Sequence, residues 1–485
     1  MASALRDLLQ TVAGLIAAGL ERANVIERSR LRATVDLAWP RVVTGFSRMS
    51  QQTADLAMVG LVLGSPAIAG LAFAYAYWQV GNRVSLGISG GSISLVSQHF
   101  GGDDVAMADR AIVQSFLLAT VVSIPLVGLF HWGAEPLIAL FSPEPDALAF
   151  GATYLAVLAP AIVFEFYNKV ASRIFAGVGD TFTPMMIRAG GAALNIVLNA
   201  IFIFGLGMGV VGAAAGTVIA TVLVTIAFAW GLFGGAYPNR APLPVGLRLA
   251  GPAVDPTVLR PLVVVSTPLI FQQLARAVVV FPLLTIAAVF GSTAVAAFEI
   301  ARRIRDLINS LSWGYSIASS SLVGRHLGAD EEGVATAYGD EILKLAVVSY
   351  VAVAAVIFAF ADPVSRLFVT DPDAIELTTL FVRVAVIASI GLGLDGVATG
   401  ALRGAGDTRW PFYGALVGLY VFTLPVAYLG VVTPLGIRAL YAALLVETFV
   451  PAAVTIYRYR TGAWRAVSRS LRAASSGTGA SPDRE

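Results

Sequence analysis

Long apolar stretches alternate with short polar or charged connections along almost the whole chain. Each stretch is close to the ~20 residues that an α-helix needs to cross the hydrocarbon core of a membrane. Several are longer, which indicates helices that tilt or extend beyond the headgroups. The pattern predicts twelve transmembrane helices, at about 37–63, 67–97, 110–132, 148–174, 184–206, 209–233, 260–290, 293–322, 340–361, 374–402, 411–431 and 435–458.

The second half of the chain repeats the first with an offset of 227 residues. The turn Gly177-Val-Gly-Asp-Thr181 matches Gly404-Ala-Gly-Asp-Thr408, and the same shift carries His99 onto His326. A repeat with a fixed offset indicates a duplicated unit. Six spans per half is an even number, so both halves enter the membrane from the same side and form a parallel repeat.

The repeat and the composition of the connections together predict five segments. Residues 36–235 and 262–460 are expected to form two six-helix bundles. The connection at 236–261 contains six prolines, which is typical of a stiff linker. Residues 1–35 have apolar side chains at helical spacing from Leu5 to Ile16, which predicts an amphipathic helix on the cytoplasmic membrane surface. Residues 461–485 are expected to be a disordered cytoplasmic tail.

Composition agrees with an all-α membrane protein and excludes several other classes. Only 13% of the residues are charged and the mean hydropathy is +0.80, whereas soluble domains are nearer a quarter charged. Cysteine is absent and the net charge is +2, so neither thiol chemistry nor a nucleic-acid partner is expected. No P-loop motif is present, and we expect neither an enzyme nor a bound cofactor. Arginines concentrate in one set of connections, which places both termini in the cytoplasm of a protein in the plasma membrane.

Four polar residues in the first half are predicted to lie at one depth in the membrane. Asp55, Asn199 and Thr217 are each seven or eight residues from the outer end of their spans, which is roughly 10–12 Å. Asn195 is one helical turn from Asn199, on the same face. An acidic residue inside a membrane span is a functional candidate, so this cluster is a candidate site for a proton or Na⁺. The alternative is a structural hydrogen-bond network around Asp55.

Other charged residues within spans have weaker functional signals. Glu165 and Lys169 stand at i, i+4 and predict a neutralising pair, and Glu165 and Asn168 are also candidates for lining a cavity. In the second half, Arg276 and Asp395 are candidates for contact with a substrate. There we favour a structural network of ion pairs, formed by Arg276, Glu299, Arg302, Arg303, Arg305, Asp306, Asp395 and Glu447.

A set of motifs, in order along residues 36–460, resembles the MATE family (multidrug and toxic compound extrusion) of the MOP flippase superfamily. The resemblance is nearest to its DinF-like and archaeal-type branch. It implies two V-shaped bundles and export by alternating access, with Asp55 as the coupling residue and Asn195 and Thr217 as its polar partners. The motifs are Asp55-Leu-Ala-Met-Val-Gly60, Ser97-Gln-His-Phe-Gly101, Asn195-Ile-Val-Leu-Asn199, Gly209-Val-Val-Gly-Ala-Ala214, Leu322-Val-Gly-Arg-His-Leu-Gly-Ala329 and Leu402-Arg-Gly-Ala-Gly-Asp-Thr408.

Two residues depart from the family pattern. Asn199 stands where that branch often has an aspartate, so the ion and the stoichiometry stay open. Arg276 stands near the place where the NorM-like branch has an acid, which leaves an anionic or zwitterionic substrate open.

The sequence therefore predicts an antiporter that exports organic cations and amphipathic drugs in exchange for H⁺ or Na⁺. One alternative is a lipid-linked sugar flippase, or an exporter of anionic substrates, of the same superfamily. Another is a membrane scaffold or sensor that transports nothing. A monomer is expected, because the duplication supplies within one chain the two halves that a dimer would otherwise provide.

Overall fold

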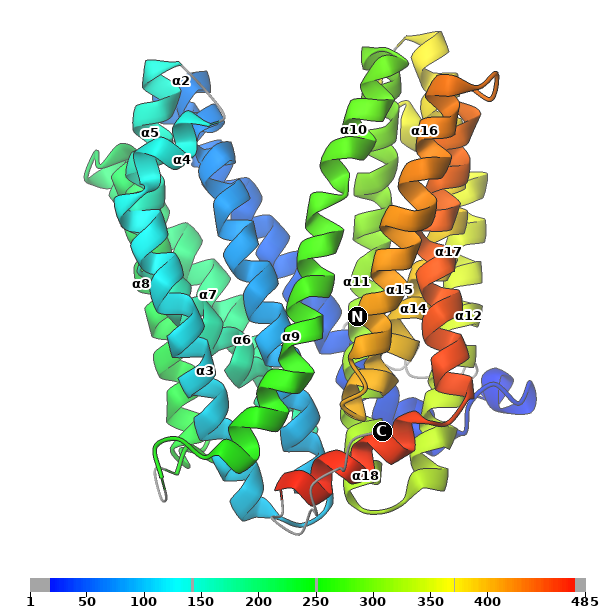
Figure 1. Ribbon diagram of the computed structural model, residues 1–485. Helices are drawn as coiled ribbons and strands as arrows, with labels where there is room; N and C mark the ends of the chain where they lie inside the picture. The colour runs from blue at the N-terminus through cyan, green and yellow to red at the C-terminus, as the bar shows by residue number, and fades with distance from the viewer. Residues whose placement is uncertain (1–17, 141–143, 249–251, 370, 476–485) are drawn as a thin grey trace, which may run out of the picture. The chain divides into compact units, whose positions relative to one another are not determined.

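The computed structural model describes residues 18–140, 144–248, 252–369 and 371–475, and within them it is helical and contains no strand (Figure 1). Eight of the described helices are long and apolar enough to cross a membrane, or nine if one bent pair counts as a single span. The three remaining predicted spans lie in α2 (Arg28–Gly101) and α11 (Ser292–Gly328). All twelve predicted spans thus coincide with helices. The predicted amphipathic helix at residues 5–16 lies outside the described residues.

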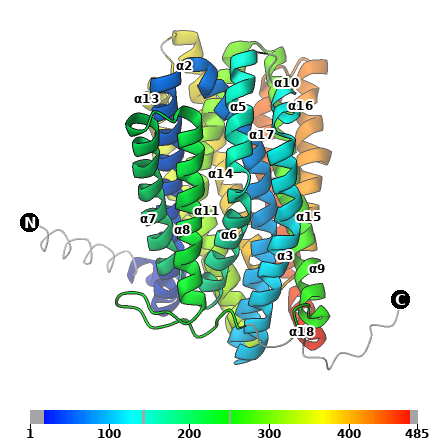
Figure 2. The same cartoon turned by 90° about the vertical axis from the view of Figure 1, so that its left-hand side faces the viewer.

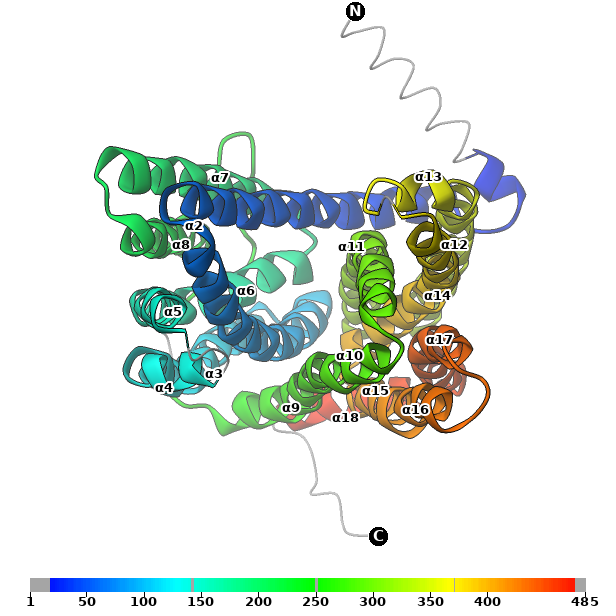
Figure 3. The same ribbon diagram turned by 90° about the horizontal axis from the view of Figure 1, so that it is seen from above.

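Helix α2 carries two of the predicted spans in one continuous run of helical backbone. Its 74 residues would extend roughly 110 Å if they were straight, far more than the thickness of a bilayer. The ribbon instead turns back on itself at a corner (Figure 3). Each arm therefore serves as one span, and the first arm carries Asp55.

The chain divides into two compact units. The first unit comprises Pro40–Ala277 and the described residues from Ala466 onward; the second comprises Val278–Arg465 and the described residues up to Trp39. After α2, the first unit contains α3 (Val105–Trp132), α4 (Ala134–Ala139), α5 (Pro145–Leu158), α6 (Ala161–Gly177), α7 (Phe182–Ala200), the π-helix η1 (Ile201–Gly205), α8 (Gly209–Leu232) and α9 (Pro256–Val278). The second contains α10 (Val280–Val289), α11, α12 (Glu332–Ala359), α13 (Ala361–Ser365), α14 (Pro372–Gly404), α15 (Arg409–Leu416), the π-helix η2 (Val417–Thr423), α16 (Leu424–Val432) and α17 (Arg438–Arg460).

The backbone shows the predicted repeat. Helices α3 and α12 begin at Val105 and Glu332, 227 residues apart. Left-handed backbone conformations recur at the same offset, in the pairs Asp103 and Asp330, Gly179 and Gly406, and Gly209 and Gly436. The two halves differ where α5 and α6 meet at 54°, one above the other in Figure 2, while α14 is unbroken. Pro160 lies at this break and its counterpart is Ile387; proline lacks the N–H that a continuous helix needs.

Close helix packing in the second unit depends on small residues. Gly396, Gly400 and Gly404 follow one another by four residues along α14 and face α11, where they meet Ser312, Ser316 and Ser320. A Cβ atom at Gly400 would lie 2.5 Å from the carbonyl oxygen of Ser316. Such small-residue stripes let two membrane helices approach closely.

The repeated Gly-Asp-Thr turn has a structural role in both halves. In the first, the Asp180 carboxylate accepts a hydrogen bond of 2.9 Å from the backbone N–H of Thr183 and so caps the start of α7. In the second, Asp407 accepts from Arg458 Nε at 2.6 Å. The aspartate of this turn therefore stabilises the start of α7 in the first half and pairs with α17 in the second.

The predicted disordered tail is wrong for residues 464–475, which form α18 (Trp464–Ser475). Trp464 is buried, stacks on the ring of Tyr459 and donates from Nε1 to the Tyr459 carbonyl at 2.9 Å. Ser468 donates to Gln98 Oε1 at 2.7 Å. The composition of this segment did not indicate these contacts, because the surface that orders the helix comes from other parts of the chain. Residues 476–485 lie outside the described residues.

Candidate functional site

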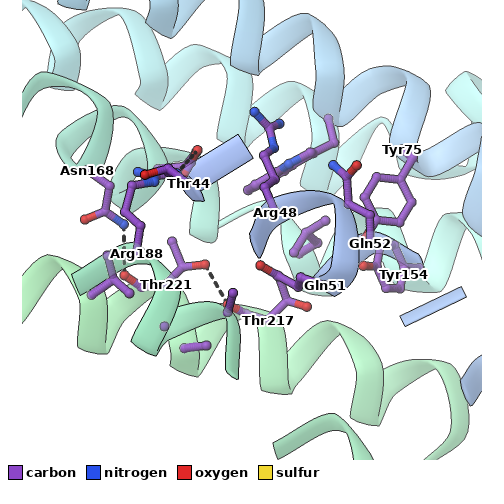
Figure 4. A pocket seen from close by; sticks show the side chains of 17 residues that line it. Thr44, Arg48, Gln51, Gln52, Tyr75, Tyr154, Asn168, Arg188, Thr217 and Thr221 are labelled. Carbon is purple, nitrogen blue, oxygen red and sulfur yellow. Dashed lines mark hydrogen bonds and ion pairs between the residues drawn. The ribbon is translucent and has the colours of Figure 1, made fainter. Parts of the chain in front are cut away.

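A cavity of about 90 Å³ lies inside the first unit (Figure 4). This volume holds several water molecules. Side chains of both arms of α2 and of α5, α6, α7 and α8 line it, and the labelled ones are polar. A polar cavity within membrane-spanning helices indicates a pathway or binding site.

The four residues of the predicted coupling cluster lie together as one hydrogen-bonded chain. Asp55 is 0% exposed, and its Oδ1 accepts from Asn199 Nδ2 at 2.7 Å. Asn199 Nδ2 also lies 3.4 Å from Asn195 Oδ1, and Asn195 Nδ2 donates to Thr217 Oγ1 at 3.0 Å. Tyr75, which sequence reasoning missed, donates its hydroxyl to Asp55 Oδ2 at 3.3 Å. Thr217 and Tyr75 also line the cavity.

The charge of Asp55 has no ionic counterpart in the described part of the chain: no Lys, Arg or His nitrogen lies within 4.0 Å of its carboxylate. The neighbouring Asn199 Oδ1 is buried and has no hydrogen-bond partner among the described residues. Asn199 is the second-last residue of α7, and the π-helix η1 begins two residues later at Ile201. The contact between Asp55 and Asn199 therefore joins the first arm of α2 to α7 close to an irregular segment of helix. π-Helical segments of this kind are frequent at functional sites.

Gly216 on α8 makes room for Asn199. A Cβ atom at Gly216 would lie 2.0 Å from Asn199 Oδ1 and 3.2 Å from the Asn199 backbone nitrogen. We therefore expect Gly216→Ala to push the amide away from Asp55, to cost about 1–3 kcal/mol of stability and to impair the antiport that the sequence predicts. Thermal unfolding in detergent and dye transport in vesicles would measure the two effects.

The matched control is Gly190→Ala on the neighbouring helix α7. No atom lies within 4 Å of the Cβ position at Gly190, and alanine is favoured over glycine inside a helix by roughly 0.5–1 kcal/mol. This variant should be as stable as the parent or more so, with unchanged transport. Equal behaviour of the two variants would contradict a role for the space at Gly216.

A second buried cluster surrounds Glu165 on α6. The predicted pair forms, with Lys169 Nζ 2.5 Å from Glu165 Oε1. Arg188 on α7, which the sequence did not single out, adds two contacts from Nη2 to the same carboxylate at 3.0 and 3.3 Å. Lys169 Nζ also donates to Asn82 Oδ1 at 3.0 Å. Glu165 and Asn168 line the cavity, and Asn168 Nδ2 donates to the Thr221 carbonyl at 3.1 Å.

Further cavity residues come from a polar stripe on the first arm of α2. Thr44, Arg48, Gln51 and Gln52 all line the cavity, and Asp55 follows at the same spacing. Steps of three and four residues place these side chains on one helical face. The stripe was visible in the sequence as polar residues at helical spacing within a predicted membrane span, and sequence reasoning used only Asp55.

The charged residues of the second unit form separate pairs. Arg305 holds Glu447 through two bonds of 2.7 and 3.0 Å, and Arg302 Nη1 lies 2.9 Å from Glu299. Asp395 accepts from Thr455 at 3.0 Å and from Thr399 at 3.3 Å. Two ion pairs of the predicted set are therefore present, but the contacts found among the described residues do not join its eight members into one network. Asp306 and Arg303 are exposed, and Arg276 lies near the end of α9 in the first unit.

Known sequences include relatives that match most of the chain. The MatE family profile matches residues 40–201 and again 268–429, once in each half. The chain is 28% identical over 448 residues to a probable multidrug resistance protein NorM of Bradyrhizobium diazoefficiens, covering 90% of this chain and 94% of that protein. It is 24% identical over 385 residues to multidrug and toxin extrusion protein 1 of Homo sapiens, covering 77% of this chain and 64% of that protein.

Solved structures share the fold. A crystal structure of MATE in the straight conformation matches with a TM-score of 0.81 at 24% identity, covering 91% of this chain and 97% of that one. An outward-facing conformation of a multidrug resistance MATE transporter matches with a TM-score of 0.81 at 24% identity, covering 90% and 96%. The assignment to the DinF-like and archaeal-type branch stays a prediction. The two family matches cover well over half of the sequence, and the chain therefore belongs to the MATE family of membrane transporters.

Proposed function

We propose that this protein is a multidrug exporter of the cytoplasmic membrane that exchanges amphipathic drugs for H⁺ or Na⁺ at Asp55. The printed functions of its relatives, multidrug resistance and multidrug and toxin extrusion, support drug export. The excess of arginine in one set of connections supports cytoplasmic termini. A monomer with no bound cofactor is sufficient for this activity.

The observation that carries the proposal is the isolated buried carboxylate of Asp55. A charged carboxylate away from water is costly unless a cation or proton neutralises it. The two hydrogen bonds from Asn199 and Tyr75 orient the carboxylate but do not cancel its charge. A coupling ion that enters the cluster supplies the missing positive charge, and the carboxylate is free again when the ion leaves.

Two ions fit the surrounding groups in different ways. A proton needs only the carboxylate itself. Na⁺ is a hard cation that takes oxygen ligands, as Ca²⁺ and Mg²⁺ do, and the cluster offers the Asp55 carboxylate, the unpartnered Asn199 Oδ1 and the Thr217 hydroxyl. Rotation of the Asn199 amide would present its oxygen rather than its nitrogen to a cation beside Asp55.

Neutralising Asp55 changes the contact between α2 and α7. An ion or proton from the outer side weakens the charge-assisted bond with Asn199 and lets the first arm of α2 repack against α7 at η1. Because Thr44, Arg48, Gln51 and Gln52 are on the same arm, the repacking changes the cavity and displaces a bound drug. Loss of the ion toward the cytoplasm restores the starting state.

The test is ethidium transport in inside-out vesicles while the proton and sodium gradients are collapsed in turn. Loss of transport with a protonophore alone would support proton antiport, and loss on sodium collapse alone would support a sodium site at Asp55 and Asn199. Transport that survives both treatments would contradict ion coupling. Absence of any gradient-dependent dye movement would contradict drug export by this route.

A further inference from the structure

Arg48 projects from the polar stripe of α2 toward the cavity. Its side chain lines the cavity (Figure 4), and in the part of the chain that the structure describes its guanidinium makes no hydrogen bond and no ion pair within 4.0 Å. Lys169 differs, since Glu165 and Asn82 hold its ammonium. An arginine inside the membrane is expensive unless something compensates its charge.

Arg188 lines the same cavity, and only some of its hydrogen-bond donors have a partner among the described residues. Its Nη2 contacts the Glu165 carboxylate, while its Nη1 is buried and has no hydrogen-bond partner among the described residues. Glu165 cannot neutralise both arginines, because it is already the partner of Lys169. The cavity lining thus combines two guanidinium groups with one shared carboxylate, and it keeps an excess of positive charge.

The Asp55 carboxylate is a negative group at a defined distance from the positive guanidinium of Arg48. It follows Arg48 by seven residues on the same helical face, which corresponds to roughly 10 Å along α2. The neutral side chains of Gln51 and Gln52 lie between them and line the cavity. Tyr75 lines the cavity and donates its hydroxyl to Asp55, so one side chain separates the Asp55 carboxylate from the space that Arg48 faces.

We propose that Arg48, assisted by Arg188, binds the carboxylate of a zwitterionic amphipathic drug, whose cationic group lies toward Asp55. The inference rests on the proposed export function and adds the class of substrate. A guanidinium binds a planar carboxylate through two parallel hydrogen bonds, which satisfies the unused donors. A drug that carries only positive charge has no carboxylate to accept hydrogen bonds from these donors, and it lies near the like charge of Arg48.

Rhodamine 110 and its methyl ester rhodamine 123 test the proposal, since they share one cationic ring system and differ in the free carboxylate. Fluorescence anisotropy with the purified full chain in detergent gives the Kd of each dye. We expect the acid to bind more tightly than the ester. Arg48→Gln should weaken binding of the acid about 10- to 100-fold, the value of a hydrogen bond to a charged group, and change ester binding less than about twofold.

Two further variants separate a binding role from a structural one. Arg48→Lys keeps the charge but loses the paired donors, so its affinity for the acid should be intermediate. Arg110→Gln removes an arginine near the start of α3, outside the cavity, where the side chain is 48% exposed, and should change neither Kd. Arg48→Gln should not lower the melting temperature, because it removes an uncompensated charge.

Equal affinity of the parent protein for acid and ester would overturn the proposal, as would an equal loss of both in Arg48→Gln. Failure of both dyes to bind would overturn it as well. These outcomes leave ion-coupled ethidium transport untouched, so the proposed function can stand without the inference. Conversely, a clear preference for the acid together with gradient-independent transport would refute the coupling and keep the carboxylate site.

Discussion

Replacing Asp55 by asparagine is expected to reduce gradient-driven ethidium transport in inside-out vesicles to the level of vesicles without the protein. The amide cannot bind and release a proton at physiological pH, and as a neutral ligand it holds Na⁺ weakly. Ion flow and drug movement then lose the group through which the proposal couples them. The initial transport rate, measured with a proton or sodium gradient imposed, is the direct readout.

The Asp55→Asn variant should remain folded, which makes the result interpretable. Asparagine has nearly the same size and shape, and a rotated Asn199 amide can donate to or accept from it in place of the 2.7 Å bond. We expect a stability within about 1 kcal/mol of the parent protein, the value of one net hydrogen bond. The control is Asp362→Asn on α13, where the carboxylate pairs with Arg366 on the surface. Coupled transport that survives in Asp55→Asn would refute the proposed role.

Replacing Glu165 by glutamine should destabilise the protein by about 3–5 kcal/mol, the cost of breaking a buried ion pair from one side. Glu165 is the partner of both Lys169 and Arg188, and Arg48 lies in the same cavity. The neutral amide leaves these cations facing one another without an intervening carboxylate. Thermal and chemical unfolding in detergent would show the loss as a lower melting temperature.

Two comparisons make the Glu165 result specific. Glu135→Gln on α4 removes an exposed glutamate and should leave the melting temperature nearly unchanged, since exposed charges contribute little. Adding Lys169→Met to Glu165→Gln should recover part of the loss, because one unpaired cation disappears. A melting temperature that is the same for Glu165→Gln and the parent protein would show that the cluster does not hold the first unit together.

The two halves of the chain differ more in their buried side chains than in their backbones. Their backbones follow one pattern down to paired left-handed residues, yet the polar cavity lies in the first unit. By the repeat, Asp55 corresponds to Pro282 and Lys169 to Gly396, which packs against Ser312 in a close helix contact. Duplication therefore preserved the helices, while substitutions at matching positions produced a buried polar site in one half and tight packing in the other.

From the sequence alone we could predict the membrane class, the twelve spans, the repeat and the common depth of Asp55, Asn199 and Thr217. These features are local or periodic: span length follows from apolar runs, the repeat from identical offsets, and depth from the rise per residue of a helix. The break at Pro160 is of the same kind, because the chemistry of one residue causes it.

The contacts between side chains of different helices could not be predicted from the sequence, because they depend on how the helices pack. Arg188 and Glu165 are 23 residues apart on different helices, and no periodicity relates them. Whether Arg48 faces lipid, a partner or a cavity depends on the rotation of α2 against α6, α7 and α8, which packing sets. Helix α18 was missed for the same reason, since its order comes from the surface that buries Trp464 and not from its own polar composition.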